Sequence, residues 1–164
     1  MTLLRPVAAL FGLGMLQIFL PQVWGVLGLV DWLLIYVVLE TLRGSFRRSI
    51  VLGAGAGLIQ DGLSGGIIGL HAFAKTSVAA LIATFGGLLV VRGPFPEALV
   101  TGLAALLEGV LVVAWQALLE RPGSLGPTEV VARAVATALA TLAALMAARW
   151  WEHRKLRRRL GGRR

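Results

Sequence analysis

The chain alternates between long apolar segments and short polar turns, and this pattern predicts six membrane helices. About 20 apolar residues are needed to cross a bilayer as an α-helix. By that measure the predicted helices cover residues 3–20, 31–42, 49–60, 67–91, 97–119 and 128–151. Pro21 is expected to close the first helix, and Asp31 is suited to cap the N-terminus of the second. The second helix is short for a span, so its start could lie as early as Val26.

The composition indicates an integral membrane protein with one bundle. Of the 164 residues, 57% are hydrophobic and 15% are charged, whereas about a quarter are charged in a typical soluble domain. We therefore expect an all-α six-helix transmembrane domain over residues 1–151 and a basic tail over residues 152–164. The sequence contains no cysteine, which excludes disulfides and thiolate metal ligands.

Positive charge is concentrated on one predicted side of the membrane. With both termini placed in the cytoplasm, thirteen of the sixteen Lys and Arg residues lie on that side, and only Arg121 and Arg133 lie outside. This asymmetry follows the positive-inside rule. The tail is expected to meet anionic lipid headgroups rather than nucleic acid. Its basic residues near the last helix are Arg154, Lys155, Arg157, Arg158 and Arg159.

Four ionisable residues are predicted to face one another inside the bundle. Lys75 and Glu108 both fall near the middle of the bilayer, counted at about 1.5 Å per residue along their helices. Because an isolated charge at that depth costs at least about 2.5–3.5 kcal/mol, the two are expected to pair. Asp61 and His71 bracket a glycine-rich turn, where a hydrogen bond can join them. Together the four could form one polar track, which is either a packing clasp or a site for a ligand or partner.

Two helix faces carry small residues at helical spacing, and both are candidate docking faces for another helix. Gly53 and Gly57 would allow a second backbone to approach closely. In the last predicted helix, alanine recurs at every fourth position, and an alternative explanation is that alanine is simply abundant in this chain. The repeated positions are Ala132, Ala136, Ala140 and Ala144.

Patterns typical of catalysis are missing from the sequence. It contains no His-Glu-x-x-His, no glycine-rich phosphate loop and no Gly-x-Ser-x-Gly, which are common signatures of hydrolases and nucleotide-binding enzymes. With only two histidines and no cysteine, a metal site is not expected. We therefore expect neither enzymatic activity nor a cofactor.

Two stretches of the sequence carry a family resemblance. The first is Asp31-Trp-Leu-Leu-Ile-Tyr, and the second is GLIQDGLSGGIIGLHA, which begins at Gly57. They resemble the MreD family of bacterial rod shape-determining membrane proteins, in which a GL-x-x-D run and a following LG-x-H-A bracket the turn between the third and fourth helices. Lys75 and Glu108 lie outside this pattern. The positions that make up the motif turn are Gly57, Gln60, Asp61, Gly65, Gly66, Gly69 and His71.

The resemblance implies a non-enzymatic component of the cell-elongation complex that makes peptidoglycan, in the bacterial inner membrane. Proteins of this family pair with MreC, which has a single membrane helix. RodA and a class B penicillin-binding transpeptidase belong to the same complex, and MreB filaments are linked to its cytoplasmic side. The MreD fold is also similar to the S-components of energy-coupling-factor vitamin transporters. A subunit that binds a small molecule such as a vitamin is therefore the alternative function.

Overall fold

The computed structural model describes residues 4–65, 67–86, 91–119 and 126–161, and within these ranges all regular secondary structure is helical. Within these ranges, six α-helices and one short 3₁₀ helix follow one another. They are α1 (Leu4–Val23), η1 (Gly25–Leu29), α2 (Trp32–Arg43), α3 (Phe46–Ser64), α4 (Leu70–Phe85), α5 (Pro94–Leu118) and α6 (Pro127–Gly161).

The first two helices differ from their predicted bounds. Helix α1 continues through Pro21 to Val23, so this proline does not end the helix. The start of α2 is at Trp32 and not near Val26, because the Asp31 carboxylate accepts a hydrogen bond from the Leu34 N–H at 2.8 Å and caps the helix. Part of the connection predicted before α2 forms η1.

The later helices also differ in length from the prediction. Helix α3 is longer than residues 49–60 at both ends. Helix α4 begins after Gly69, whose φ of 98° is not helical. It ends at Phe85 rather than Val91, although residues 87–90 lie outside the described ranges. Helix α6 runs without a break to Gly161. The last helix thus includes most of the segment that was predicted to be a separate tail.

Among the described residues, three helices are long and apolar enough to cross a membrane. The candidate spans are Pro6–Val23, Pro94–Leu118 and Pro127–Lys155, in α1, α5 and α6. Helix α2 has 12 residues, a length of about 18 Å, which is short of the roughly 30 Å of a hydrocarbon core. The predicted bundle of six spans is therefore matched in its number of helices, whereas six crossings stay a prediction.

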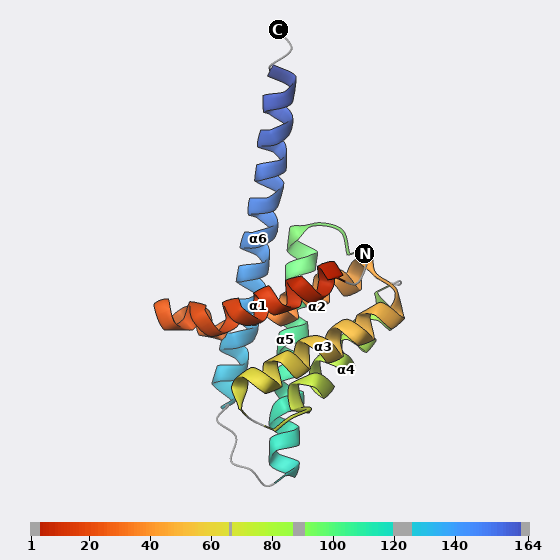
Figure 1. The fold of residues 1–164 in the computed structure, drawn as a ribbon, viewed down its shortest axis with the longest axis vertical. Helices are drawn as coiled ribbons and strands as arrows, with labels where there is room; N and C mark the ends of the chain where they lie inside the picture. Colours follow the sequence, from red (N-terminus) through yellow and green to blue (C-terminus); the bar gives the residue numbers. More distant parts are fainter. Residues whose placement is uncertain (1–3, 66, 87–90, 120–125, 162–164) are drawn as a thin grey trace.

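Helix α2 lies at the centre of the molecule and packs between two groups of helices. Its residues Leu33 and Val37 contact a core formed with α1, α3 and α4. Residues Leu34 and Val38 contact a second core formed with α4, α5 and α6. Helix α3 runs beside α4 and α5 beside α6, while α1 crosses the molecule and the C-terminal part of α6 projects well beyond the other helices (Figure 1). Through these two cores, α2 contacts each of the other five described α-helices.

One end of the molecule gathers several residues that were predicted to be cytoplasmic. Arg43 at the end of α2 forms an ion pair with Glu97 in the first turn of α5, at 3.2 Å. Arg149 of α6 lies beside Gly93, the residue before α5. The turn between α3 and α4 lies at the other end (Figure 1). The predicted topology puts these two ends on opposite sides of the membrane, and that topology stays a prediction.

Candidate functional site

The turn between α3 and α4 is organised by one buried carboxylate. Asp61 is 1% exposed and accepts hydrogen bonds from the backbone N–H groups of Gly69, His71 and Ala72 at 2.8, 2.9 and 3.2 Å. The ring Nδ1 of His71 lies 2.9 Å from Asp61 Oδ1, so the hydrogen bond predicted between these residues is present. Gly65 and Gly69 have φ values of 63° and 98°, a region that favours glycine. The motif residues thus build a closed, internally bonded turn.

The glycines of α3 face α4 and not an outside partner. A Cβ atom added at Gly57 would lie 2.2 Å from Ala72 Cα, and one added at Gly53 would lie 2.9 Å from the Lys75 carbonyl oxygen. Both glycines are buried. The prediction that they form a docking face for a foreign helix is therefore wrong, because α4 of the same chain already occupies the space that they leave.

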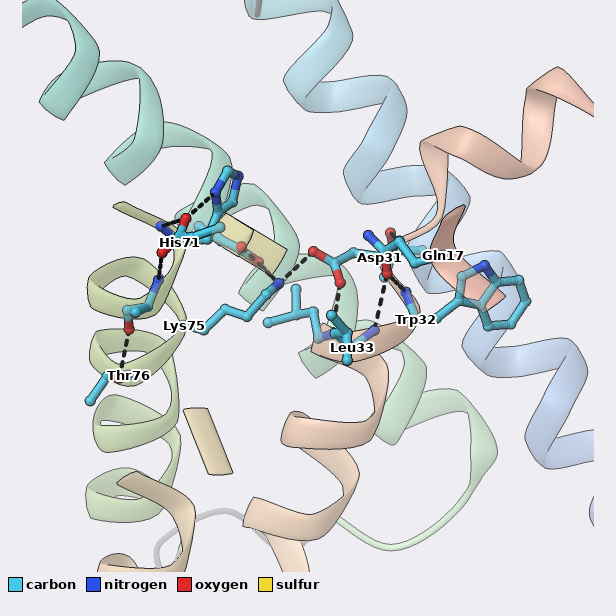
Figure 2. A network of polar contacts seen from close by, with 12 residues as sticks. Gln17, Asp31, Trp32, Leu33, His71, Lys75 and Thr76 are labelled. Carbon is cyan, nitrogen blue, oxygen red and sulfur yellow. Dashed lines mark hydrogen bonds and ion pairs between the residues drawn. The ribbon is translucent and has the colours of Figure 1, made fainter. Parts of the chain in front are cut away.

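A buried ammonium group joins three helices near the centre of the molecule. Lys75 of α4 is fully buried, and its Nζ lies 2.8 and 3.0 Å from the two carboxylate oxygens of Glu108 in α5. The predicted contact between these residues is confirmed. The same Nζ lies 2.5 Å from Asp31 Oδ2 at the start of α2 (Figure 2). We refer to Asp31, Lys75 and Glu108 as the ionic cluster.

The role of Asp31 in this cluster was missed in the sequence. Asp31 was predicted only as a helix cap, and it does cap α2 through Oδ1 while Oδ2 binds Lys75. The length of the predicted second helix could have indicated this role. A helix that is too short to span a bilayer can begin inside the apolar layer, at the depth of Lys75. Its cap is then an internal carboxylate.

The start of α2 is also bound to α1 and α6. The side-chain oxygen of Gln17 accepts hydrogen bonds from the N–H groups of Trp32 and Leu33, at 3.1 and 3.4 Å (Figure 2). The Asp31 N–H donates to Thr137 Oγ1 of α6 at 3.2 Å. Because the first N–H groups of a helix have no partner within it, these side chains satisfy donors that would otherwise be buried without an acceptor.

A cavity of about 40 Å³ lies beside the ionic cluster, and residues of α1, η1, α3, α4, α5 and α6 line it together with Asp31, the N-cap of α2. Asp31 and Glu108 line it together with His71, Gln60 and Arg133. No hydrogen bond joins the Asp61–His71 pair to the ionic cluster among the described residues. The predicted polar track is thus two separate groups beside one cavity. Since pockets for small-molecule ligands measure about 300–1,000 Å³, this cavity does not support a vitamin site like that of an S-component.

None of the four alanines in the predicted stripe on α6 is fully buried. Ala132 and Ala144 are exposed, whereas Ala136 and Ala140 are half-buried. The buried face of this helix is formed by other residues, namely Val130, Ala134, Thr137 and Thr141. Part of the alanine stripe is therefore exposed, whereas the α3 glycines are covered by α4.

The other predicted residues lie at the edge of the described structure. In the tail, Lys155 is exposed, and the guanidinium of Arg154 lies 4.2 Å from the ring centroid of Trp150. Gly66, Arg121 and the side chains of Arg157, Arg158 and Arg159 lie outside the described part. Over the described residues, no cluster of three or more His, Asp or Glu side chains is placed to hold a metal ion.

The fold and the buried groups together define an all-helical membrane protein. Its ionic groups hold helices together at the level of the apolar spans. Residues 2–146 match the family model described as rod shape-determining protein MreD. The chain belongs to the MreD family, which is a family of shape-determining membrane proteins and not one of known enzymes. Comparison with curated proteins found no match, and comparison with solved structures also found none.

Proposed function

We propose that this protein is a membrane scaffold of the bacterial cell-elongation complex and that it binds the membrane helix of MreC. The observation that carries the proposal is the family match over residues 2–146, since membership of the family implies a role in determining rod shape. On this proposal the protein lies in the inner membrane with both termini in the cytoplasm. RodA and a class B penicillin-binding transpeptidase act in the same complex during peptidoglycan synthesis.

The alanine stripe of α6 is the proposed docking face for MreC. Helices in lipid associate through close packing, which small side chains permit. Among the two faces considered from the sequence, the α3 glycines are covered by α4. Ala132 and Ala144 of α6 are exposed and remain able to contact a partner helix.

A matched pair of substitutions tests this docking face. Ala144 and Val131 are both exposed on α6, and Val131 points about 100° or more away from each of the four stripe alanines. We expect Ala144→Leu to abolish co-purification with MreC from detergent-solubilised membranes, because the larger side chain prevents close approach. Val131→Phe adds bulk to a different face of α6 and should leave the complex intact. Equal recovery of MreC with both variants would exclude the stripe as the docking face.

The C-terminal part of α6 is the proposed contact with the cytoplasmic side. A helix of 35 residues is about 52 Å long and exceeds a hydrocarbon core of roughly 30 Å. Its basic residues then lie at the headgroups and beyond, where anionic lipid attracts them. Deletion of residues 152–164 should lower the amount of anionic lipid that co-purifies with the detergent-solubilised protein. If the deletion leaves lipid binding unchanged but prevents MreB recruitment, MreB is the partner of this segment instead.

A further inference from the structure

The ionic cluster contains more negative than positive groups. Asp31 and Glu108 provide two carboxylates, and Lys75 provides one ammonium group to both of them. With all three ionised, the cluster has a net charge of −1, which is two negative charges and one positive. An unpaired charge buried at membrane depth is strongly destabilising. The net charge of the cluster can be removed in two ways, by a proton on one carboxylate or by one more positive group nearby.

The neighbouring elements provide few groups that could supply this charge. On α3, Asp61 is negative and already accepts four hydrogen bonds. On α4, His71 bonds to Asp61 through Nδ1, and on α1 the cavity is lined by the neutral Gln17. Helix α6 contributes Arg133, whose side chain lines the same cavity as Glu108. Among the described residues that line this cavity, Arg133 is the one permanent cation.

Arg133 is only partly engaged by its own helix. One guanidinium nitrogen, Nη2, lies 3.0 Å from Glu129 Oε1, and the two side chains are 41% and 37% exposed. An ion pair with that exposure contributes little to stability. The Nε atom of Arg133 is buried, and no acceptor for it is found within the described ranges. Arg133 therefore has hydrogen-bonding capacity left.

The space beside Arg133 suits water. The Oε1 atom of Gln60, another lining residue, is also buried and has no donor among the described residues. A cavity with polar partners and a volume above about 10–15 Å³ can hold a water molecule, and this one measures about 40 Å³. Water can bridge two polar groups nearly as well as direct contact. The cavity can thus connect α6 to the ionic cluster.

We propose that this cavity is a hydrated site in which Arg133 is the second counter-ion of the ionic cluster, linked to Glu108 through water. The charges of Asp31, Lys75, Glu108 and Arg133 then sum to zero. Arg133 is a positioning residue in this arrangement. Together with the contact between Asp31 and Thr137, it holds α6 against the start of α2. The proposal does not depend on which partner α6 binds.

A double-mutant cycle on the full chain tests the coupling. Glu108→Gln and Arg133→Gln each leave one unbalanced charge, whereas the double variant is balanced again. We expect each single variant to lower the apparent Tm in detergent by roughly 5–15 °C. The double variant should lose clearly less than the sum of the two losses. Folded protein from the double variant, where a single variant yields none, would support the coupling in the same way.

Two results of this cycle would overturn the proposal. If the losses of the two single variants simply add, the two side chains are not coupled. If Glu108→Gln is as stable as the unchanged protein, the cluster balances its charge by binding a proton and does not need Arg133. As a control, Arg149→Gln removes an exposed arginine from the same helix and should leave the Tm unchanged.

Two further variants separate the cavity from the surface ion pair. Glu129→Gln removes the surface partner of Arg133 and should leave the Tm unchanged or higher, since the guanidinium can then turn fully to the cavity. Arg133→Lys keeps the charge and should recover at least half of the Tm that Arg133→Gln loses. A loss with Glu129→Gln as large as that with Arg133→Gln would show that the surface pair is the role of Arg133. No recovery with Arg133→Lys would likewise refute the electrostatic account.

Discussion

The Asp61 carboxylate can be replaced by an amide of nearly the same size, and this change tests how the turn is held. In the native turn, Oδ2 accepts hydrogen bonds from the N–H groups of Gly69 and Ala72. The other oxygen, Oδ1, accepts a hydrogen bond from the backbone N–H of His71 and is also hydrogen-bonded to the ring Nδ1 of that residue. An Asn side chain has only one acceptor oxygen. If its NH₂ group faces Gly69 and Ala72, both of their backbone N–H groups lose their acceptor. If the NH₂ group faces His71, the backbone N–H of His71 loses its acceptor, while the ring Nδ1 can accept from the NH₂ group in its other tautomer. At least one buried donor is therefore left without an acceptor.

The expected loss can be worked from these bonds. Each buried donor left without a partner costs about 1–3 kcal/mol, so Asp61→Asn, in the orientation that leaves one donor unpaired, should reduce the free energy of unfolding by about 1–3 kcal/mol. For a chain of this size 1 kcal/mol corresponds to roughly 2–4 °C. The apparent Tm should therefore fall by about 2–12 °C. Intrinsic tryptophan fluorescence of the purified protein in detergent, followed on heating, measures this shift.

A control removes the same charge from a position that carries no such bonds. Glu152 is exposed on α6, and Glu152→Gln should leave the apparent Tm unchanged. An Asp61→Asn variant whose Tm lies within about 1 °C of the unchanged protein, less than the loss of one buried hydrogen-bond partner, would refute the claim that this carboxylate organises the turn. A similar loss in both variants would point to charge alone as the cause.

Other substitutions test the remaining contacts. Gly57→Ala places a methyl group 2.2 Å from the Cα of Ala72 and should lower the free energy of unfolding by about 1–3 kcal/mol through overpacking. As the control on the same helix, Gly62→Ala meets open space and should leave the Tm unchanged or slightly raised. Equal thermal stability of these two α3 variants would contradict the packing of α3 on α4. Lys75→Met leaves the carboxylates of the ionic cluster without their ammonium group and should cost about 3–5 kcal/mol, measured as a loss of monodisperse protein after heating. Because the chain has no cysteine, Ser64→Cys can be labelled selectively in intact cells, and an impermeant maleimide should reach it from outside only. Labelling solely from the cytoplasmic side would overturn the proposed topology.

Several features of this protein were readable from its sequence because they depend on local pattern and depth. Runs of apolar residues predicted six helices, since a chain in lipid must satisfy its backbone hydrogen bonds within each segment. The spacing of the motif residues predicted the turn and the bond between Asp61 and His71. Counting residues along two helices placed Lys75 and Glu108 at a common depth, where charges must pair. Each of these inferences used distances along the chain alone.

Only the tertiary structure decided which faces meet. The α3 glycines looked like a docking surface until α4 was seen to lie against them, because a small residue permits close approach without specifying the neighbour. Asp31 belongs to the ionic cluster because α2 starts deep in the molecule. The position of this start depends on the path of the chain through α1 and η1. Arg133, predicted on the outer side of the membrane, lines the internal cavity because the packing of α6 on α5 turns it inward. These contacts depend on packing between residues far apart in the sequence, and the local pattern of apolar and polar residues does not specify that packing.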